Sequence, residues 1–230
     1  MNSLSTAVTK SIGQLGDAAI LRVLFKTIMI TLAIFALLGG ALWAGLSQIL
    51  GDRGFAFSAE LGAVVAILVA LIGGWLLFRI VALAVLQFFA DEVVQAVEAK
   101  HYPGSLGKAR KLGFGEELSN SARGIGRALI ANALAAIVAI PLLFTAIGPA
   151  ILFWAVNAWL LGRELQDMVW LRHRSLPDEA PPLNAITRFL LGGVVAALLV
   201  VPFLNLLAPI IGAASAAHLV HGRKGSNNAA

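Results

Sequence analysis

Four long runs without charged residues divide the chain. They cover residues 27–51, 61–78, 128–162 and 189–222. About 20 residues of α-helix cross a hydrocarbon core of roughly 30 Å, so most of these runs are long enough to enter a bilayer. The pattern predicts an all-α integral membrane protein, with residues 1–230 forming a single membrane domain.

The first two runs are typical of full transmembrane helices. We expect a cytoplasmic segment over residues 1–26, then a span over 27–50, which is too long for a signal-peptide core and is therefore retained. A second span is predicted over 61–100; its distal part carries acidic residues between apolar positions and continues as an amphipathic cytoplasmic extension. A polar, glycine-rich cytoplasmic linker over 104–127 follows.

The last two runs share one layout, in which a proline, a short apolar turn and a second proline separate two arms. The prolines are Pro141 and Pro149 in the run over 128–162, and Pro202 and Pro209 in the run over 189–221. Arms of about 13 residues reach only about 20 Å, which is too short to cross the core. The repeat predicts two Pro-broken re-entrant helical hairpins that penetrate part of the bilayer. Two kinked single spans are the alternative.

The placement of basic residues favours the hairpins. If both hairpins return to the side they entered from, the cytoplasmic segment over 163–188 and the flexible tail over 222–230 share that side with the N-terminus. Of the 17 lysines and arginines, Arg53 alone then lies on the opposite side. This positive-inside pattern predicts a bacterial inner-membrane protein with both termini in the cytoplasm.

Composition excludes a soluble enzyme. Hydrophobic residues make up 59% of the chain and charged residues 13%, against about 25% charged residues in soluble proteins. The mean hydropathy is +0.88. The formal net charge of +5 is better explained by anionic lipid headgroups than by nucleic acid, because the basic residues flank the apolar runs. The absence of cysteine excludes disulfides and thiolate metal sites.

Candidate catalytic and metal-binding motifs are missing. None of the four histidines belongs to an H-E-x-x-H pattern, and no nucleophile is paired with a base. His218 and His221 are three residues apart and could share a helix face, either as a metal pair or as the interfacial end of a helix; the second interpretation is favoured. We therefore predict no catalytic residue, no cofactor and no metal site.

A basic segment before the first span has the chemistry of an anion site. Asp17 can cap a helix that starts near Ala18, and the first-turn amides of such a helix bind oxyanions, especially beside a guanidinium. Arg22 supplies the guanidinium, and Lys26 adds charge one turn further on. The alternative is that both side chains only anchor the inner end of the span.

Polar residues within and after the hairpins suggest further roles. Asn157 and Asn205 lie in apolar stretches and are candidates for buried hydrogen bonds between the hairpins. Arg163 and Asp167 are spaced as an i,i+4 ion pair, which could be structural or could gate a cytoplasmic mouth.

Several short motifs occur in the order found in a known family. They are Arg127-Ala128-Leu129-Ile130, Ile140-Pro141, Gly148-Pro149, Ala158-Trp159-Leu160-Leu161, Pro202-Phe203-Leu204-Asn205-Leu206-Leu207 with Pro209, and Gly212-Ala213-Ala214. Together they resemble the CysZ sulfate permease family, also called the etoposide-induced-protein-like family. The resemblance covers nearly the whole chain and is strongest over residues 127–221.

The resemblance implies two long transmembrane helices, two partly penetrating hairpins, homo-oligomers and sulfate uptake. The family's anion-contacting motif, Gly-Ile-Arg-Arg, matches Ala19-Ile20-Leu21-Arg22, so only its second arginine is present. The resemblance therefore implies an anion site at Ile20, Leu21 and Arg22, with Lys26 beside it. We expect a transporter or channel for sulfate or a related small anion, its path lined by the hairpin prolines and asparagines; a membrane protein with a structural or interaction role is the alternative.

Overall fold

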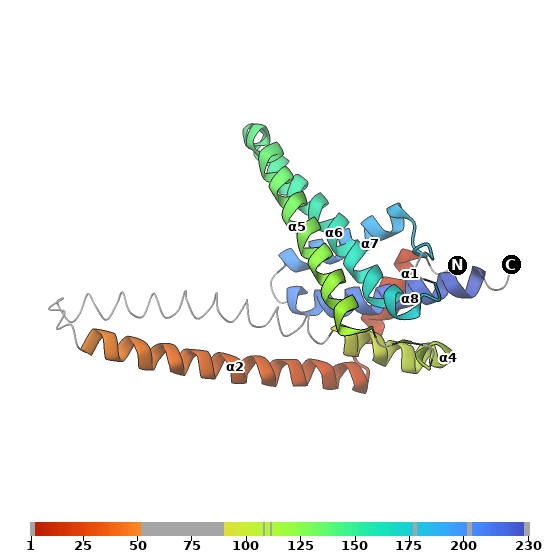
Figure 1. The fold of residues 1–230 in the computed structure, drawn as a ribbon, viewed down its shortest axis with the longest axis horizontal. Helices are drawn as coiled ribbons and strands as arrows, with labels where there is room; N and C mark the ends of the chain where they lie inside the picture. Colours follow the sequence, from red (N-terminus) through yellow and green to blue (C-terminus); the bar gives the residue numbers. More distant parts are fainter. Residues whose placement is uncertain are drawn as a thin grey trace. The chain divides into compact units, whose positions relative to one another are not determined.

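The computed structural model describes residues 3–51, 90–107, 109–110, 112–176, 179–201 and 204–227 (Figure 1). The labelled helices are α1 (Leu4–Gly13), α2 (Ala18–Gly51), α4 (Pro103–Leu106), α5 (Phe114–Leu142), the 3-10 helix η1 (Leu143–Thr145), α6 (Gly148–His173), α7 (Ala185–Val200) and α8 (Leu204–Asn227). Residues 90–101 form a further helix. These residues contain no strand, so the prediction of an all-α protein is confirmed.

The chain divides into two compact units. Unit 2 comprises Leu21–Phe89, of which residues 21–51 are described. They form most of α2, whose stretch Ala18–Ala41 is apolar and long enough to cross a membrane. The span predicted over 27–50 is therefore helical throughout. Residues 61–89 of the second predicted span lie outside the described residues. Its last part, from residue 90, belongs to the helix over 90–101.

Unit 1 comprises Met1–Ile20 and Ala90–Ala230, and its first helix pair is a long hairpin of α5 and α6. The turn between them agrees with the prediction, since η1 and two further residues separate the helices. Its arms are longer than the predicted 13 residues, because α5 has 29 residues and α6 has 26. Residues 114–127 of the predicted linker belong to α5. Glu116 and Glu117 lie in its first turn, where carboxylates favour helix formation.

Side-chain hydrogen bonds close the turn of this hairpin. The hydroxyl of Thr145 donates to the carbonyl oxygen of Leu142 at 2.6 Å and accepts from the amide of Gly148 at 3.0 Å. Pro149 lies in the first turn of α6, where its missing N–H costs nothing. Ala146 has a φ of 58°, a backbone conformation that favours glycine.

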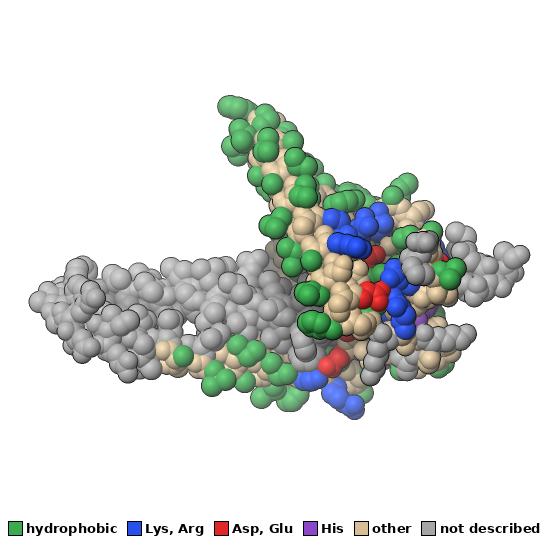
Figure 2. Space-filling view, viewed as in Figure 1, with side chains coloured by type: hydrophobic (Ala, Val, Ile, Leu, Met, Phe, Trp, Pro, Cys, Tyr) green, Lys and Arg blue, Asp and Glu red, His purple; other side chains and the backbone are tan. Residues whose placement is uncertain are grey.

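The outward surface of the α5–α6 hairpin is apolar. Figure 2 shows hydrophobic side chains along the hairpin up to its tip and charged side chains gathered near its base. Phe144 at the tip is 95% exposed, and Ile130, Ile137 and Ile151 are also exposed. An apolar surface of this extent is unstable in water, so it requires lipid or a protein partner.

The second helix pair, α7 and α8, turns earlier than predicted. Residues 204–208 were expected in a turn, but α8 already begins at Leu204, so this prediction is wrong. Pro209 lies inside α8 and is buried. Because proline has no N–H, the carbonyl of Asn205 lacks its usual helical hydrogen bond, which is the one backbone bond lost. Pro202 lies outside the described residues. How far either hairpin enters a membrane stays a prediction.

Helices α1, α6, α7 and α8 pack together as the core of unit 1. α8 contributes small side chains that are completely buried, such as Ala213, Ala214 and Ala217. At the crossing of α6 and α7, Gly162 and Gly192 lie against backbone atoms of the opposite helix. The absence of side chains there allows the two backbones to approach closely.

Candidate functional site

All four histidines of the chain lie in one polar cluster inside unit 1. His101 ends the helix over 90–101, His173 ends α6, and His218 and His221 lie in α8. The rings of His101 and His218 are 5.3 Å apart between centroids, and those of His173 and His221 are 4.8 Å apart. Three segments distant in sequence thus meet at this histidine cluster.

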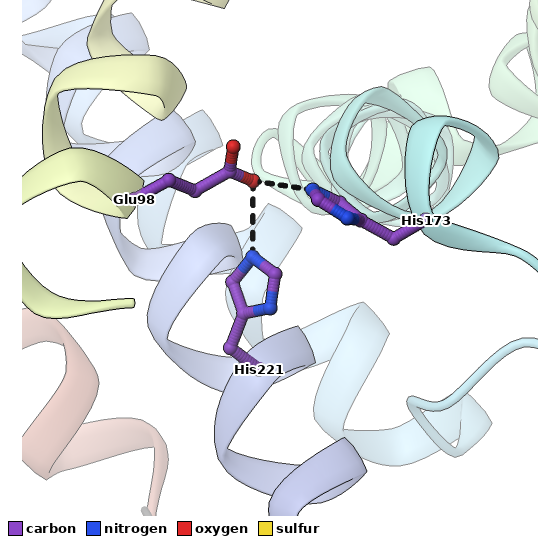
Figure 3. A group of neighbouring side chains, drawn as sticks. All are labelled: Glu98, His173 and His221. Carbon is purple, nitrogen blue, oxygen red and sulfur yellow. Dashed lines mark hydrogen bonds and ion pairs between the residues drawn. The ribbon is translucent and has the colours of Figure 1, made fainter. Parts of the chain in front are cut away.

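Glu98 is the acidic centre of the cluster (Figure 3). The Nε2 atoms of His173 and His221 donate to the same carboxylate oxygen, Glu98 Oε1, at 2.7 and 3.0 Å. The Glu98 side chain is 0% exposed. Burial opposes its ionisation, but the hydrogen bonds from the two histidines outweigh burial and lower the pKa of Glu98 to about 2. Glu98 is therefore a buried, ionised carboxylate at neutral pH.

The second oxygen of Glu98 is poorly satisfied. Glu98 Oε2 is buried without a hydrogen-bond partner among the described residues, and the NH2 of Arg172 lies 3.9 Å away from it. At that distance the guanidinium attracts the carboxylate without forming a hydrogen bond. Since a buried charged oxygen normally has several partners, this orphaned acceptor marks the place where the cluster has unused binding capacity.

A chain of hydrogen bonds links His218 to α1. The amide nitrogen of Gln14 donates to Nε2 of His101 at 2.8 Å and to Nε2 of His218 at 2.9 Å. Because Nε2 of His218 accepts, its ring proton lies on Nδ1, which donates to the hydroxyl of Tyr102 at 2.9 Å. Tyr102 also stacks on His221, with ring centroids 4.8 Å apart. The cluster thereby joins α1, the helix over 90–101, α6 and α8.

Sequence reasoning missed this cluster. The favoured interpretation placed His218 and His221 at the interfacial end of a helix. In the structure both side chains are instead buried inside unit 1. They do not bond to each other either; His221 pairs with Glu98 and His218 with Gln14. The sequence feature that could have revealed the cluster is the position of Glu98, which follows Val94 by four residues and therefore shares the buried side of its helix.

An arginine-lined groove of about 1230 Å³ lies beside this cluster. Its basic lining residues are Arg110, Arg123, Arg127, Arg163, Arg172 and Arg174, and its acidic ones are Asp91, Glu117, Glu164, Asp167 and Glu179. The Nε of Arg163 lies 3.8 Å from Asp167 Oδ2, in agreement with the predicted i,i+4 pair. Because the two signs of charge nearly balance, the groove has no strong preference for anions.

The predicted anion-site residues lie at the start of α2. The helix begins at Ala18 as predicted. Arg22 and Lys26, one turn apart, are exposed, Leu21 is 49% exposed, and Ile20 is 2% exposed. The carboxylate of Asp17 accepts from Lys100 Nζ at 2.7 Å. The role of these residues stays a prediction.

The predicted path residues are spread over the two helix pairs. Pro141 lies in the last turn of α5 and is exposed, and Asn205 lies in the first turn of α8. Asn157 is exposed on α6 and donates to the carbonyl of Phe153 in its own helix at 2.8 Å. Asn157 is therefore not the buried residue that was expected, and the hydrogen bond of its amide nitrogen lies within α6.

Comparison with known proteins identifies one match. The family model described as "Sulfate transporter CysZ/Etoposide-induced protein 2.4" matches residues 7–209. That range includes most of the described helices and all but two of the histidine-cluster residues. No curated protein and no solved structure matches the chain.

Proposed function

We propose that this chain, which belongs to the sulfate transporter CysZ/etoposide-induced protein 2.4 family, is a membrane transporter or channel for sulfate or a related small anion. The observation that carries the proposal is the family match over residues 7–209. A transporter-like role in a membrane fits both the family and the apolar helices. We place the protein in a bacterial inner membrane, with both termini in the cytoplasm, as a homo-oligomer that contacts lipid.

The start of α2 is the proposed recruiting site. The first backbone amides of any α-helix have no acceptor within the helix, and the helix dipole favours negative charge there. Ile20, the third residue of α2, would supply such an amide, Leu21 would lie beside the anion, and the exposed Arg22 would donate to sulfate oxygens through its guanidinium. Lys26 would add positive charge one turn away. A charge-assisted hydrogen bond of this kind contributes about 1.5–3 kcal/mol.

The turns of the hairpins are proposed to line the path. Pro141 and Pro149 flank the turn of the first hairpin, and Asn205 and Pro209 lie early in α8, just after the turn of the second. Backbone groups without helical partners need protein or water at membrane depth. Pro141, Pro149, Asn157, Asn205 and Pro209 are the described residues with this role, and Pro202 is expected to share it. Because transport requires no catalytic chemistry, we also propose that the protein is not an enzyme.

Uptake of radiolabelled sulfate into liposomes tests the proposal. The wild-type protein would be compared with empty liposomes, with Arg22→Ala and with Lys10→Ala, which removes an equally positive and exposed side chain from α1. We expect saturable uptake by the wild type and by Lys10→Ala. Loss of one charge-assisted hydrogen bond should reduce uptake at low sulfate by at least about tenfold in Arg22→Ala.

Two outcomes would count against the proposal. Uptake that is equal in Arg22→Ala and the wild type would remove the start of α2 from the path. Absence of uptake by folded wild-type protein, with sulfate and with other small anions, would favour the alternative of a structural or interaction role in the membrane. Circular dichroism and gel filtration in detergent would establish that each sample is folded.

A further inference from the structure

Glu98, His173 and His221 have the arrangement of a metal-binding site. One potential ligand atom from each residue lies within 4.8 Å of the others. The three side chains come from the helix over 90–101, from α6 and from α8, and they converge on one point in Figure 3. The side-chain exposures are 0% for Glu98, 5% for His173 and 4% for His221. Such convergence of buried ligand atoms from distant segments is characteristic of metal centres.

The distances are close to those of an occupied site. In a tetrahedral zinc site, bonds of about 2.0–2.1 Å place neighbouring ligand atoms about 3.3 Å apart. Here Glu98 Oε1 lies 2.7 Å from His173 Nε2 and 3.0 Å from His221 Nε2. Metal binding therefore requires both histidine nitrogens to move away from Glu98 Oε1 by about 0.3–0.6 Å and to approach each other to about 3.3 Å from a separation within 4.8 Å. Each imidazole proton must also move from Nε2 to Nδ1. Small rotations of the side chains are sufficient.

The donor set selects the type of metal. Two neutral imidazoles and one carboxylate are ligands of Zn²⁺ and related first-row ions, whereas Ca²⁺ and Mg²⁺ prefer oxygen ligands. Three protein ligands leave one tetrahedral position for a water molecule. The orphaned Glu98 Oε2 can accept from that water or bind the metal as a second carboxylate oxygen.

The surroundings have opposing effects on the ion. Tyr102 stacks on His221 and fixes the plane of its ring, which favours binding. The positive charge of Arg172, 3.9 Å from Glu98 Oε2, disfavours a second cation. The ionised carboxylate lies between the metal position and Arg172 and screens them from each other. We therefore expect stoichiometric binding that a strong chelator can reverse.

We propose that Glu98, His173 and His221 bind one divalent transition-metal ion, best fitted by Zn²⁺, which fastens the helix over 90–101 to α6 and α8. The ligands come from three helices, so the ion would cross-link these helices inside unit 1. The proposal does not depend on the transported solute, because it concerns only contacts within unit 1.

Zinc binding by the purified full-length protein tests the proposal. Because an oligohistidine tag would itself bind zinc, the protein should carry a different affinity tag and should be stripped with a chelator in detergent. Zinc would then be titrated in competition with a chromogenic chelator, and bound metal would be counted by mass spectrometry. The same titration with Co²⁺ reports ligand geometry through its visible absorption.

Variants distinguish the proposed ligands from other histidines. We expect about one zinc ion per chain for the wild type and an affinity at least about tenfold lower for His173→Ala and His221→Ala. Glu98→Gln has nearly the same shape as the native side chain and should lose affinity similarly while keeping the fold. His101→Ala is the matched control, because His101 belongs to the same cluster but not to the three ligands.

The outcomes separate a metal site from a hydrogen-bonded cluster. Zinc should raise the unfolding temperature of the wild type and of His101→Ala, and should leave that of Glu98→Gln unchanged. Absence of stoichiometric zinc in folded wild-type protein would overturn the proposal. Equal binding by the wild type and Glu98→Gln would also overturn it, since the metal would then lie elsewhere. Neither result depends on sulfate transport, so failure of this proposal leaves the proposed function untouched.

Discussion

Replacing Gly192 by alanine should force α6 and α7 apart. A Cβ atom at Gly192 would overlap with the carbonyl oxygen of Ala158 and would come very close to the amide nitrogen of Gly162. Both atoms belong to the backbone of α6, so no side-chain rotation can relieve the overlap. A Cβ at Gly162 would likewise overlap with the carbonyl oxygen of Arg188 on α7. The two helices must therefore separate to accept a single methyl group.

The size of the effect follows from two opposing contributions. Overpacking a core by one methyl costs about 1–3 kcal/mol, and the upper end applies where the neighbour is backbone. Alanine replacing glycine inside a helix otherwise stabilises by about 1 kcal/mol. Gly126→Ala on α5 isolates this second contribution, because a Cβ there would meet nothing within 4 Å. Since the helix contribution is common to both variants, they should differ by the overpacking cost of about 3 kcal/mol, or roughly 9 °C in unfolding temperature.

Tryptophan fluorescence during heating in detergent measures this difference. Trp154 donates from Nε1 to the carbonyl of Gly193 at 3.2 Å, so its emission reports on the crossing of α6 and α7. We expect Gly192→Ala to unfold well below the wild type and Gly126→Ala slightly above it. If Gly192→Ala unfolds at the temperature of Gly126→Ala, the close crossing of the two helices is incorrect.

Three further predictions concern the cluster and the hairpin turn. The pKa of Glu98 is lowered from 4.5 to about 2 in the folded protein, so the stabilisation from its ionised form is present above pH 4.5 and is lost as the pH falls towards 2. Unfolding measured at decreasing pH should show a loss of up to about 3 kcal/mol in the wild type but not in Glu98→Gln, and parallel curves for the two proteins would contradict this. Tyr102→Phe removes the hydroxyl acceptor of His218 and should lower the free energy of unfolding by about 1–2 kcal/mol in denaturant titrations, whereas no change would mean that water replaces the hydroxyl. Ala146→Gly should relieve the strain of the positive φ and so raise the free energy of unfolding by up to about 1 kcal/mol, seen as a higher unfolding temperature. A lower unfolding temperature would show that the backbone there is not strained.

The secondary structure of the chain was largely predictable because it depends on local patterns. Charge-free runs of helical length identified α2 and the α5–α6 hairpin, and the pair Gly148-Pro149 marked the start of α6. The beginning of α5 was missed, since a Gly-containing polar stretch also suits a linker. The turn before α8 was displaced, because Pro209 can either end a turn or lie one turn inside a helix.

The histidine cluster was not predictable at the same level, because its contacts join residues that are far apart in the chain. Glu98 and His221 are separated by 123 positions, and no local pattern connects them. The amphipathic pattern over 90–101 nevertheless held a usable signal. Val93, Val94 and Val97 line its buried side, and Glu98 follows on that same side rather than among the exposed polar residues. A buried carboxylate requires partners, so it should have prompted a search for distant cations or histidines.

Hydropathy also leaves open which apolar surroundings a helix occupies. α5 and α8 are both apolar enough to cross a membrane, yet most of the apolar stretch of α5 is exposed whereas that of α8 is largely buried inside unit 1. α8 can carry His218 and His221 within an apolar stretch because Tyr102, Gln14 and Glu98 supply their partners. Among the residues that the structure describes, those of the α5–α6 hairpin are exposed over much of its length. It is therefore the described part of unit 1 whose apolar surface most needs lipid or another protein, and α8 is the part that holds the unit together.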